Sequence, residues 1–144
     1  MTRKFIITSA IAAVVSLTAI PAMANDVFLQ QYGINNVAGA AQAGVGNQLW
    51  MYQDGAFNTA IGQQNGIGNL GIQGQQGFGN TSQLNQWGVG NQAGHAQFGN
   101  GHNADSTQVG FGNMTGVIQA GQNCNAQTTQ AGAGNVALVL QACP

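Results

Sequence analysis

The amino-acid sequence predicts an all-β fold, a β-solenoid in which strands and arcs alternate and two strands complete one turn of 22 residues. Glutamine recurs at a constant interval of eleven residues without insertion or deletion, and most of these glutamines are followed by the pattern xGxG. Strict periodicity of this kind is typical of solenoids, whose repeats pack only on their neighbours. Strands of the same parity should stack into two parallel sheets about 10 Å apart, of either handedness, with cross-β amyloid order when copies assemble.

Residues 1–24 are predicted to be a secretory signal peptide. Arg3 and Lys4 form a basic start, residues 5–20 are an apolar run that is short for a membrane span, and residues 22–24 (AMA) fit a cleavage site. Cleavage would leave a mature chain with no membrane span. It would also remove every Lys and Arg, so that three aspartates remain as the fixed charges. Nucleic acid is therefore not an expected partner, because phosphate backbones are bound by clusters of cations.

Residues 25–141 are predicted to form eleven strands of seven residues, each reading NxAxxxQ, joined by xGxG connectors, with residues 142–144 as a tail. Glycine supplies the positive φ angles that a tight reversal needs. The first connector glycines are Gly33, Gly44, Gly55, Gly66, Gly77, Gly88, Gly99, Gly110, Gly121 and Gly132. The asparagines that open strands are Asn25, Asn36, Asn47, Asn58, Asn69, Asn80, Asn91, Asn113 and Asn135. The glutamines that close them are Gln31, Gln42, Gln53, Gln64, Gln75, Gln86, Gln97, Gln108, Gln119, Gln130 and Gln141.

The first, third, fifth and seventh positions of each strand are predicted to face inward, because side chains alternate between the two faces of a strand. The third position is small in most strands, which suits a narrow space between two sheets. Buried Asn and Gln amides would be costly if unpaired. Stacked in register, each amide can bond to the identical amide one turn away, so we expect two inward amide ladders along the axis.

Outward positions differ between the two sheets. Odd-numbered strands carry mainly apolar outward residues, and even-numbered strands carry mainly Thr, Gln and Asn. An extended apolar face usually marks an interface, so fibres are predicted to pair laterally through the odd-strand sheet. The candidate lateral contacts are Trp50, Tyr52, Leu70, Ile72, Leu138 and Leu140.

Cys124 and Cys143 should fall at the same edge of the last arc, because consecutive strands run in opposite directions. A disulfide between them would be permitted in a secreted protein and would stabilise the fold by about 3 kcal/mol. Two free thiols are the alternative.

Eleven is an odd number of strands. For both sheets to continue through an assembly, the next subunit must enter rotated by half a turn; otherwise one strand position stays unpaired. The sequence is compatible with either.

Catalytic and cofactor sites are not predicted. Ten similar glycine connectors without any helical segment between them do not form a dinucleotide loop. His95 and His102 occupy inward ladder positions, and with Asp105 they supply too few convergent ligands for a metal. The chain is expected not to be an enzyme and to bind no cofactor.

The pattern QxGxGNxAxxxQ, carried by residues 130–141 (QAGAGNVALVLQ) and 86–97 (QWGVGNQAGHAQ), resembles the curlin repeat of curli fibre subunits. The resemblance implies a secreted structural subunit that self-assembles into extracellular functional amyloid fibres on the bacterial surface, in the biofilm matrix, mediating adhesion and aggregation. The implied partners are further copies of the chain, other curlin subunits, and outer-membrane curli secretion and nucleation factors. Repeats without Lys or Arg favour the major, fibre-forming subunit. A minor subunit that nucleates growth and a monomeric solenoid that binds ice or carbohydrate are the alternatives.

Overall fold

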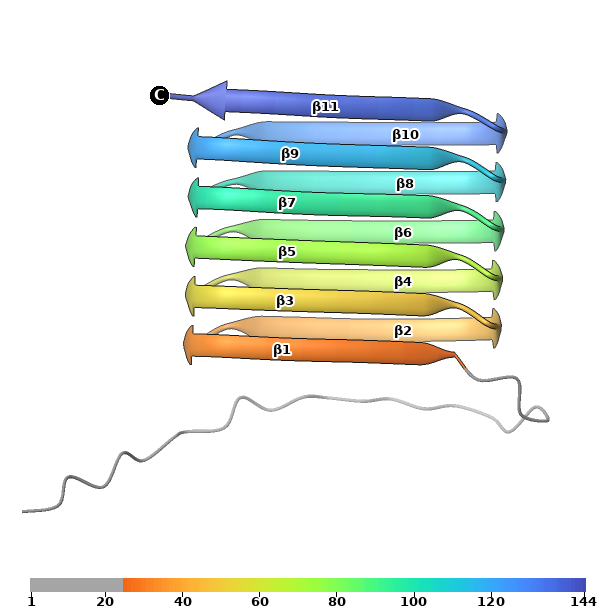
Figure 1. Ribbon diagram of the computed structural model, residues 1–144, viewed down its shortest axis with the longest axis horizontal. Helices are drawn as coiled ribbons and strands as arrows, with labels where there is room; N and C mark the ends of the chain where they lie inside the picture. Colours follow the sequence, from red (N-terminus) through yellow and green to blue (C-terminus); the bar gives the residue numbers. More distant parts are fainter. Residues whose placement is uncertain (1–24) are drawn as a thin grey trace, which may run out of the picture.

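The computed structural model describes residues 25–144, and these form eleven β-strands joined by short arcs (Figure 1). The predicted signal peptide, residues 1–24, lies outside the described residues. The strands are β1 (Asp26–Ile34), β2 (Val37–Val45), β3 (Gln48–Ala56), β4 (Thr59–Ile67), β5 (Leu70–Phe78), β6 (Thr81–Val89), β7 (Gln92–Asn100), β8 (Asn103–Phe111), β9 (Met114–Gln122), β10 (Asn125–Ala133) and β11 (Val136–Cys143). No helix among these residues is long and apolar enough to cross a membrane.

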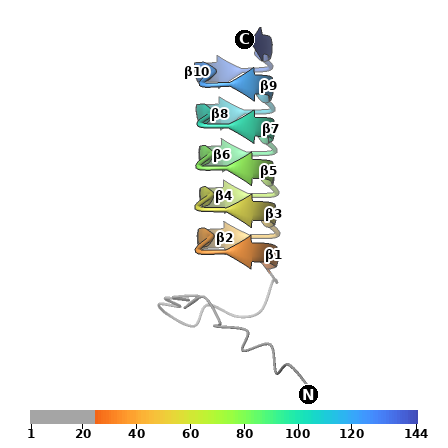
Figure 2. The same ribbon diagram turned by 90° about the vertical axis from the view of Figure 1, so that its left-hand side faces the viewer.

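The strands build two parallel sheets, which confirms the predicted β-solenoid of about five turns. Odd-numbered strands form a six-stranded sheet and even-numbered strands a five-stranded sheet. The two sheets stand face to face as two columns (Figure 2). Paired residues of neighbouring strands are always 22 positions apart in the chain, as in Phe28↔Trp50 and Gln42↔Gln64, without a slip in register.

The strands are longer than predicted. Each of the first ten has nine residues, because it begins one position after the residue predicted to open it and ends one residue past the first connector glycine. Gly88, for example, pairs with Gly66 and Gly110 in the neighbouring rungs. Likewise β11 runs to Cys143, so that two residues of the predicted tail belong to the last strand.

Chain reversal takes place at the second connector position. Its glycines have φ near 60°, as at Gly90 (φ 64°), and the non-glycine residues Asn35, Phe57 and Asn123 adopt the same conformation there, with φ of 54°, 59° and 54°. Asparagine tolerates this left-handed region better than other residues with a side chain. Each turn thus combines a glycine with φ between 103° and 133° at the first connector position and a residue with φ near 60° at the second, and non-glycine residues occur only at the second.

The narrow interior between the sheets contains both apolar and polar side chains, which alternate in groups along the solenoid axis. Leu49, Met51 and Ala60 form a small apolar cluster near the N-terminal end, and Ala104, Val117 and Ala126 form a second near the other end. Between them the inward side chains are mainly polar, with Leu84 and Ala93 as buried apolar exceptions. The inward assignment of positions one, three, five and seven of each predicted segment is confirmed, since Asn47, just before β3, and Leu49, Met51 and Gln53 within it are buried, whereas the residues between them are exposed.

Candidate functional site

The Gln side chains form two continuous hydrogen-bonded ladders inside the solenoid, one along each sheet. Each Nε2 donates to the Oε1 of the glutamine one turn further on, as from Gln64 to Gln86 (2.7 Å) and from Gln75 to Gln97 (2.8 Å). The second N–H of the same amide donates to a backbone carbonyl of the opposite sheet, such as Leu70 O for Gln86 (3.0 Å). A buried glutamine in the middle of the ladder therefore uses both donors, and the ladder also ties the two sheets together.

The Asn side chains join each strand start to the arcs around it. Asn69 donates both its backbone N–H (3.1 Å) and its Nδ2 (2.9 Å) to Asn47 Oδ1, and its Nδ2 also donates to Gly88 O (3.0 Å). Gly88 lies next to the end of β6, so this amide adds a hydrogen bond to a carbonyl close to the chain reversal. Each such Asn therefore contributes to the turn region as well as to the ladder.

His102 takes the place of an asparagine and reproduces its bonds. Its Nδ1 accepts from the backbone N–H of Cys124 (3.1 Å), as a carboxamide oxygen would. Its Nε2 lies 3.1 Å from the carbonyl oxygen of Phe98, four residues earlier, just as Asn91 Nδ2 donates to the carbonyl oxygen of Trp87 (3.3 Å). The neutral ring with its proton on Nε2 makes both bonds.

His95 lies at the centre of the polar part of the interior. Its Nδ1 is 2.8 Å from Ser82 Oγ and its Nε2 is 2.6 Å from Ser106 Oγ. Gln73 Nε2 donates to Ser82 Oγ (2.9 Å), and Ser106 Oγ is 2.7 Å from Thr128 Oγ1, so one chain of hydrogen bonds runs from β5 to β10. Burial without a compensating negative charge lowers the pKa of His95 from 6.5 to about 4.

Cys124 and Cys143 form a disulfide at the edge of the solenoid where β9 turns into β10, with their Cα atoms 5.7 Å apart. Both described cysteines are therefore oxidised. The bond joins the start of β10 to the end of β11, the strand that closes the C-terminal end of the solenoid.

The outer face of the six-stranded sheet carries the predicted apolar residues. Trp50 is 52% exposed and Leu138 is 68% exposed, while Leu70 is only half-buried between its neighbours. Aromatic rings stack along the axis on this face: the centroids of Phe28 and Trp50 are 6.3 Å apart. This face is named the apolar face below.

Sequence reasoning missed a second apolar row, which follows the arcs after the even strands. Val45, Ile67, Val89, Phe111 and Ala133 are register partners in successive rungs, and Phe111 is 63% exposed. The sequence contains the signal for this row, because these residues are the third letter of every second xGxG connector and recur at a spacing of 22.

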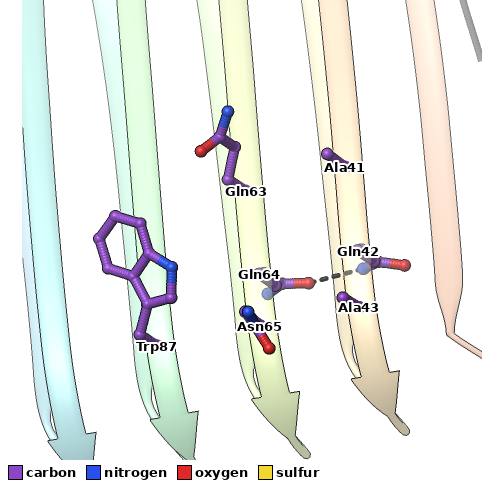
Figure 3. Close-up of a pocket in the computed structure, with 7 residues that line it drawn as sticks. All are labelled: Ala41, Gln42, Ala43, Gln63, Gln64, Asn65 and Trp87. Atoms are coloured by element: carbon purple, nitrogen blue, oxygen red, sulfur yellow. Dashed lines mark hydrogen bonds between the residues drawn. The ribbon is translucent and has the colours of Figure 1, made fainter. Parts of the chain in front are cut away.

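A shallow hollow of about 340 Å³ lies on the outer face of the five-stranded sheet (Figure 3). Trp87 stands at one side of it, the small side chains of Ala41 and Ala43 leave its floor low, and the amides of Gln63 and Asn65 lie between them (Figure 3). The bond between Gln42 and Gln64 (2.6 Å) runs behind this hollow.

No group of three or more His, Cys, Asp or Glu side chains suited to a metal ion occurs within residues 25–144. Comparison of the chain with protein-family models and with curated proteins gives no match. The site is therefore defined by its own geometry: repeated amide ladders that run from one open end of a solenoid to the other.

Proposed function

We propose that this chain is the structural subunit of an extracellular amyloid fibre of the curlin type, and that its function is to polymerise. The observation that supports this proposal is the state of the two ends. Residues 25–144 contain only strands and arcs, and they provide no helix or loop that covers the outer edges of β1, β2, β10 or β11. Open edges of this kind present unpaired N–H and C=O groups to another strand, and monomeric solenoids usually cap them.

The amide ladders support the same function. An amide in an inner rung is saturated, whereas the ladder amides in the outermost rungs, such as Gln31 and Gln141, are only half-buried. A further copy would continue each ladder and bury these groups. Addition of a copy therefore repeats the interactions that already hold one rung on the next.

As the biological role, we propose the major, fibre-forming subunit, secreted to the cell surface and without enzymatic activity. Its partners would be further copies of itself, other curlin subunits, and secretion and nucleation factors of the outer membrane. A nucleating minor subunit is the alternative within the same family.

Assembly of the purified protein tests the proposal. We expect thioflavin fluorescence to rise on incubation and oriented fibres to give reflections near 4.7 Å and 10 Å. A protein that stays monomeric and gives no cross-β reflection would contradict it.

A pair of variants separates edge addition from non-specific aggregation. Val139 faces inward in the last strand and Leu140 faces outward. Val139→Lys would place a charge where the next copy must pack, so growth should slow strongly, whereas Leu140→Lys adds the same charge on the outside and should still elongate. Equal elongation rates for the two variants would argue against addition at this end.

The hollow beside Trp87 favours carbohydrate binding as a second candidate function. An exposed indole face suits the C–H groups of a sugar ring, and the Gln63 and Asn65 amides can donate to and accept from its hydroxyls. Titration with a soluble oligosaccharide should change tryptophan fluorescence in the protein and in Trp50→Phe, but not in Trp87→Phe. An unchanged response in Trp87→Phe would exclude this hollow.

A further inference from the structure

At both ends of the solenoid one sheet extends one strand further than the other, because the number of strands in residues 25–144 is odd. β1 and β11 belong to the same six-stranded sheet, whereas the five-stranded sheet ends at β2 and β10. Figure 2 shows β11 standing alone above β10 at one end and β1 lying lowest at the other, both in the same column. Each end therefore has a projecting strand on one side and an open place beside it on the other.

We infer that successive copies join head to tail with a rotation of half a turn about the solenoid axis, so that β1 of the incoming copy pairs with β10 and its β2 pairs with β11. This inference rests on the proposed polymerisation and specifies its geometry. The projecting β1 then fills the open place above β10, and the projecting β11 fills the open place beside β1 of the incoming copy.

Strand direction is preserved by this rotation. Odd and even strands point in opposite directions on opposite sheets (Figure 1), so half a turn about the vertical axis places an odd strand parallel to the even strands below it. The 11-residue phase is preserved as well, since β1 has the position in the repeat that a twelfth strand would have. Every strand pair across the junction is therefore parallel and in register, like the pairs within the chain.

The Gln ladders have opposite chemistry at the two ends. Gln31 and Gln42 each donate to the next glutamine, but their Oε1 atoms accept no hydrogen bond from a described residue. At the other end, Gln130 Nε2 donates only to Met114 O and Gln141 Nε2 only to Asn125 O, so each keeps one N–H unused. Two acceptors face two donors, and half a turn pairs Gln130 with the incoming Gln31 and Gln141 with the incoming Gln42.

In one of its two columns, the Asn ladder can also continue across the rotated junction. Asn135 Oδ1 accepts no bond within the described chain and would receive the backbone N–H of the incoming Asn36, as Asn36 itself receives that of Asn58. In the other column the incoming Asn25 meets Cys124, which lacks a carboxamide. That column is already interrupted within the chain, where His102 supplies the acceptor for Cys124.

Stacking without rotation would leave a strand-sized gap. β1 of the incoming copy would then pair with β11, and no strand would lie between β10 and the incoming β2. The inward side chains of β1, Val27 (49% exposed) and Leu29, would face this gap instead of a packed sheet. The backbone groups on both sides of the gap would also lack partners in a buried place, which is strongly unfavourable.

Rotation has a consequence for the outside of the fibre. The apolar face of one copy lies on the opposite side from that of the next, so each side of the fibre alternates between apolar and polar segments. Two copies make one complete repeat of 22 strands, or eleven rungs in each sheet, which corresponds to about 53 Å along the axis.

Cysteine cross-linking distinguishes the two junctions. Phe28, Gln127 and Leu138 are each the third residue of their strands, point outward and are exposed. With half a turn, Phe28 of the incoming copy lies one strand spacing, about 4.8 Å, from Gln127; without rotation it lies at that spacing from Leu138. The double variants Phe28→Cys/Gln127→Cys and Phe28→Cys/Leu138→Cys are assembled without reductant, which keeps the native disulfide intact. They are then treated with a short bismaleimide and dissolved in formic acid.

We expect a ladder of covalent oligomers from the Phe28/Gln127 variant and only monomer from the Phe28/Leu138 variant. The intrachain pair Ile61→Cys/Gln83→Cys, which are register partners at the same outward position, shows that the reagent spans one rung. The reverse pattern, or fibres without any oligomers, would overturn the rotated junction while leaving polymerisation intact. Fibres of the unmodified protein give an independent measurement: electron cryo-microscopy should find an axial repeat of two copies, and a repeat of one copy would refute the half turn. Failure of the unmodified protein to form fibres would instead refute the proposed function, and the junction with it.

Discussion

At the scale of single residues, the two glycines of a connector have different roles. The first, such as Gly88 with φ 125°, lies within the paired strand, and a Cβ there would overlap the carbonyl oxygen of Gly110 in the next rung. The second, such as Gly90, has open space where a Cβ would lie. Only the first glycine is required both by its backbone conformation and by the close stacking of rungs.

Gly88→Ala and Gly90→Asn therefore form a matched test. We expect Gly88→Ala to destabilise the fold by about 3 kcal/mol, because it combines strain at positive φ with a clash against backbone. Gly90→Asn should change stability by about 1 kcal/mol or less, since Asn35 and Asn123 already adopt this conformation. Chemical denaturation of freshly purified protein measures both, and equal losses would contradict the distinction.

His95 is the residue whose protonation should matter most to the interior. In its neutral form the ring accepts from Ser82 and donates to Ser106, which continues the hydrogen-bond chain from Gln73. A protonated ring would donate from Nδ1 to Ser82 Oγ, and the O–H of Ser82, which donates to Nδ1 of the neutral ring, would then lose its acceptor. Protonation therefore leaves a buried hydroxyl donor without this partner as well as placing a charge in a buried site.

Stability should fall on acidification through this residue. The folded-state pKa of about 4 lies below the unfolded value of 6.5, so the unfolded chain binds the proton more tightly. The stabilising contribution is complete above pH 6.5 and is lost as the pH falls toward 4, by about 3 kcal/mol in total. Denaturation midpoints at pH 7, 5 and 4 measure this loss, and His95→Gln should show a clearly smaller dependence. The same dependence in both proteins would assign the loss to other groups.

At the scale of the strand, β11 is an edge strand at the C-terminal end of the six-stranded sheet, held within the described chain by backbone hydrogen bonds on one side only. It pairs with β9 on one side, and no strand of residues 25–144 pairs with its other side. The disulfide to Cys124 adds a covalent link by joining the end of β11 to the arc before β10. It holds in place the edge that an incoming copy would use.

Removal of this bond should loosen the last strand selectively. In Cys143→Ser the loss of about 3 kcal/mol corresponds to amide exchange roughly a hundredfold faster in residues 136–143, with little change in β5. Hydrogen exchange read by mass spectrometry on monomeric protein resolves the two strands. Uniform acceleration along the whole chain would show that the bond stabilises the solenoid globally.

At the scale of the whole molecule, the two outer faces differ in a way that the repeat does not require. The apolar face presents Phe28, Trp50, Ile72 and Leu138, whereas the five-stranded sheet presents mainly Thr, Gln and Asn. Contiguous apolar surface of this extent is usually covered by a partner. For a fibre subunit, we expect that partner to be a neighbouring fibre.

Charges on the apolar face should therefore separate fibres laterally without stopping their growth. Trp50→Lys with Leu138→Lys is expected to give thinner fibres in electron micrographs, because pairing would bury two unpaired cations. Gln83→Lys with Gln127→Lys places the same charge on the polar face and should leave bundling unchanged. Thinning in both variants would point to net charge instead of a specific face.

Much of this architecture was predictable from the sequence because the repeat is strict. A constant interval of eleven residues fixes the register of every strand pair, and the alternation of side chains then assigns Gln53, Leu49 and the other inward positions to the interior. The arcs were predicted less well. The extension of each strand past its closing glutamine and the apolar row through Val89 and Phe111 depend on how glycine backbones stack between rungs, which cannot be read from one repeat alone.

The sequence by itself determined the period, the parity of the strands and the identity of the ladders, because these follow from residue spacing alone. Only the tertiary structure decided which atoms of each ladder are left unused, and at which end. Gln31 and Gln141 have the same letter and the same place in the repeat, yet one end of their ladder offers an acceptor and the other a donor. That difference arises because amides bond in one direction along the axis, a direction that exists only once the rungs are stacked.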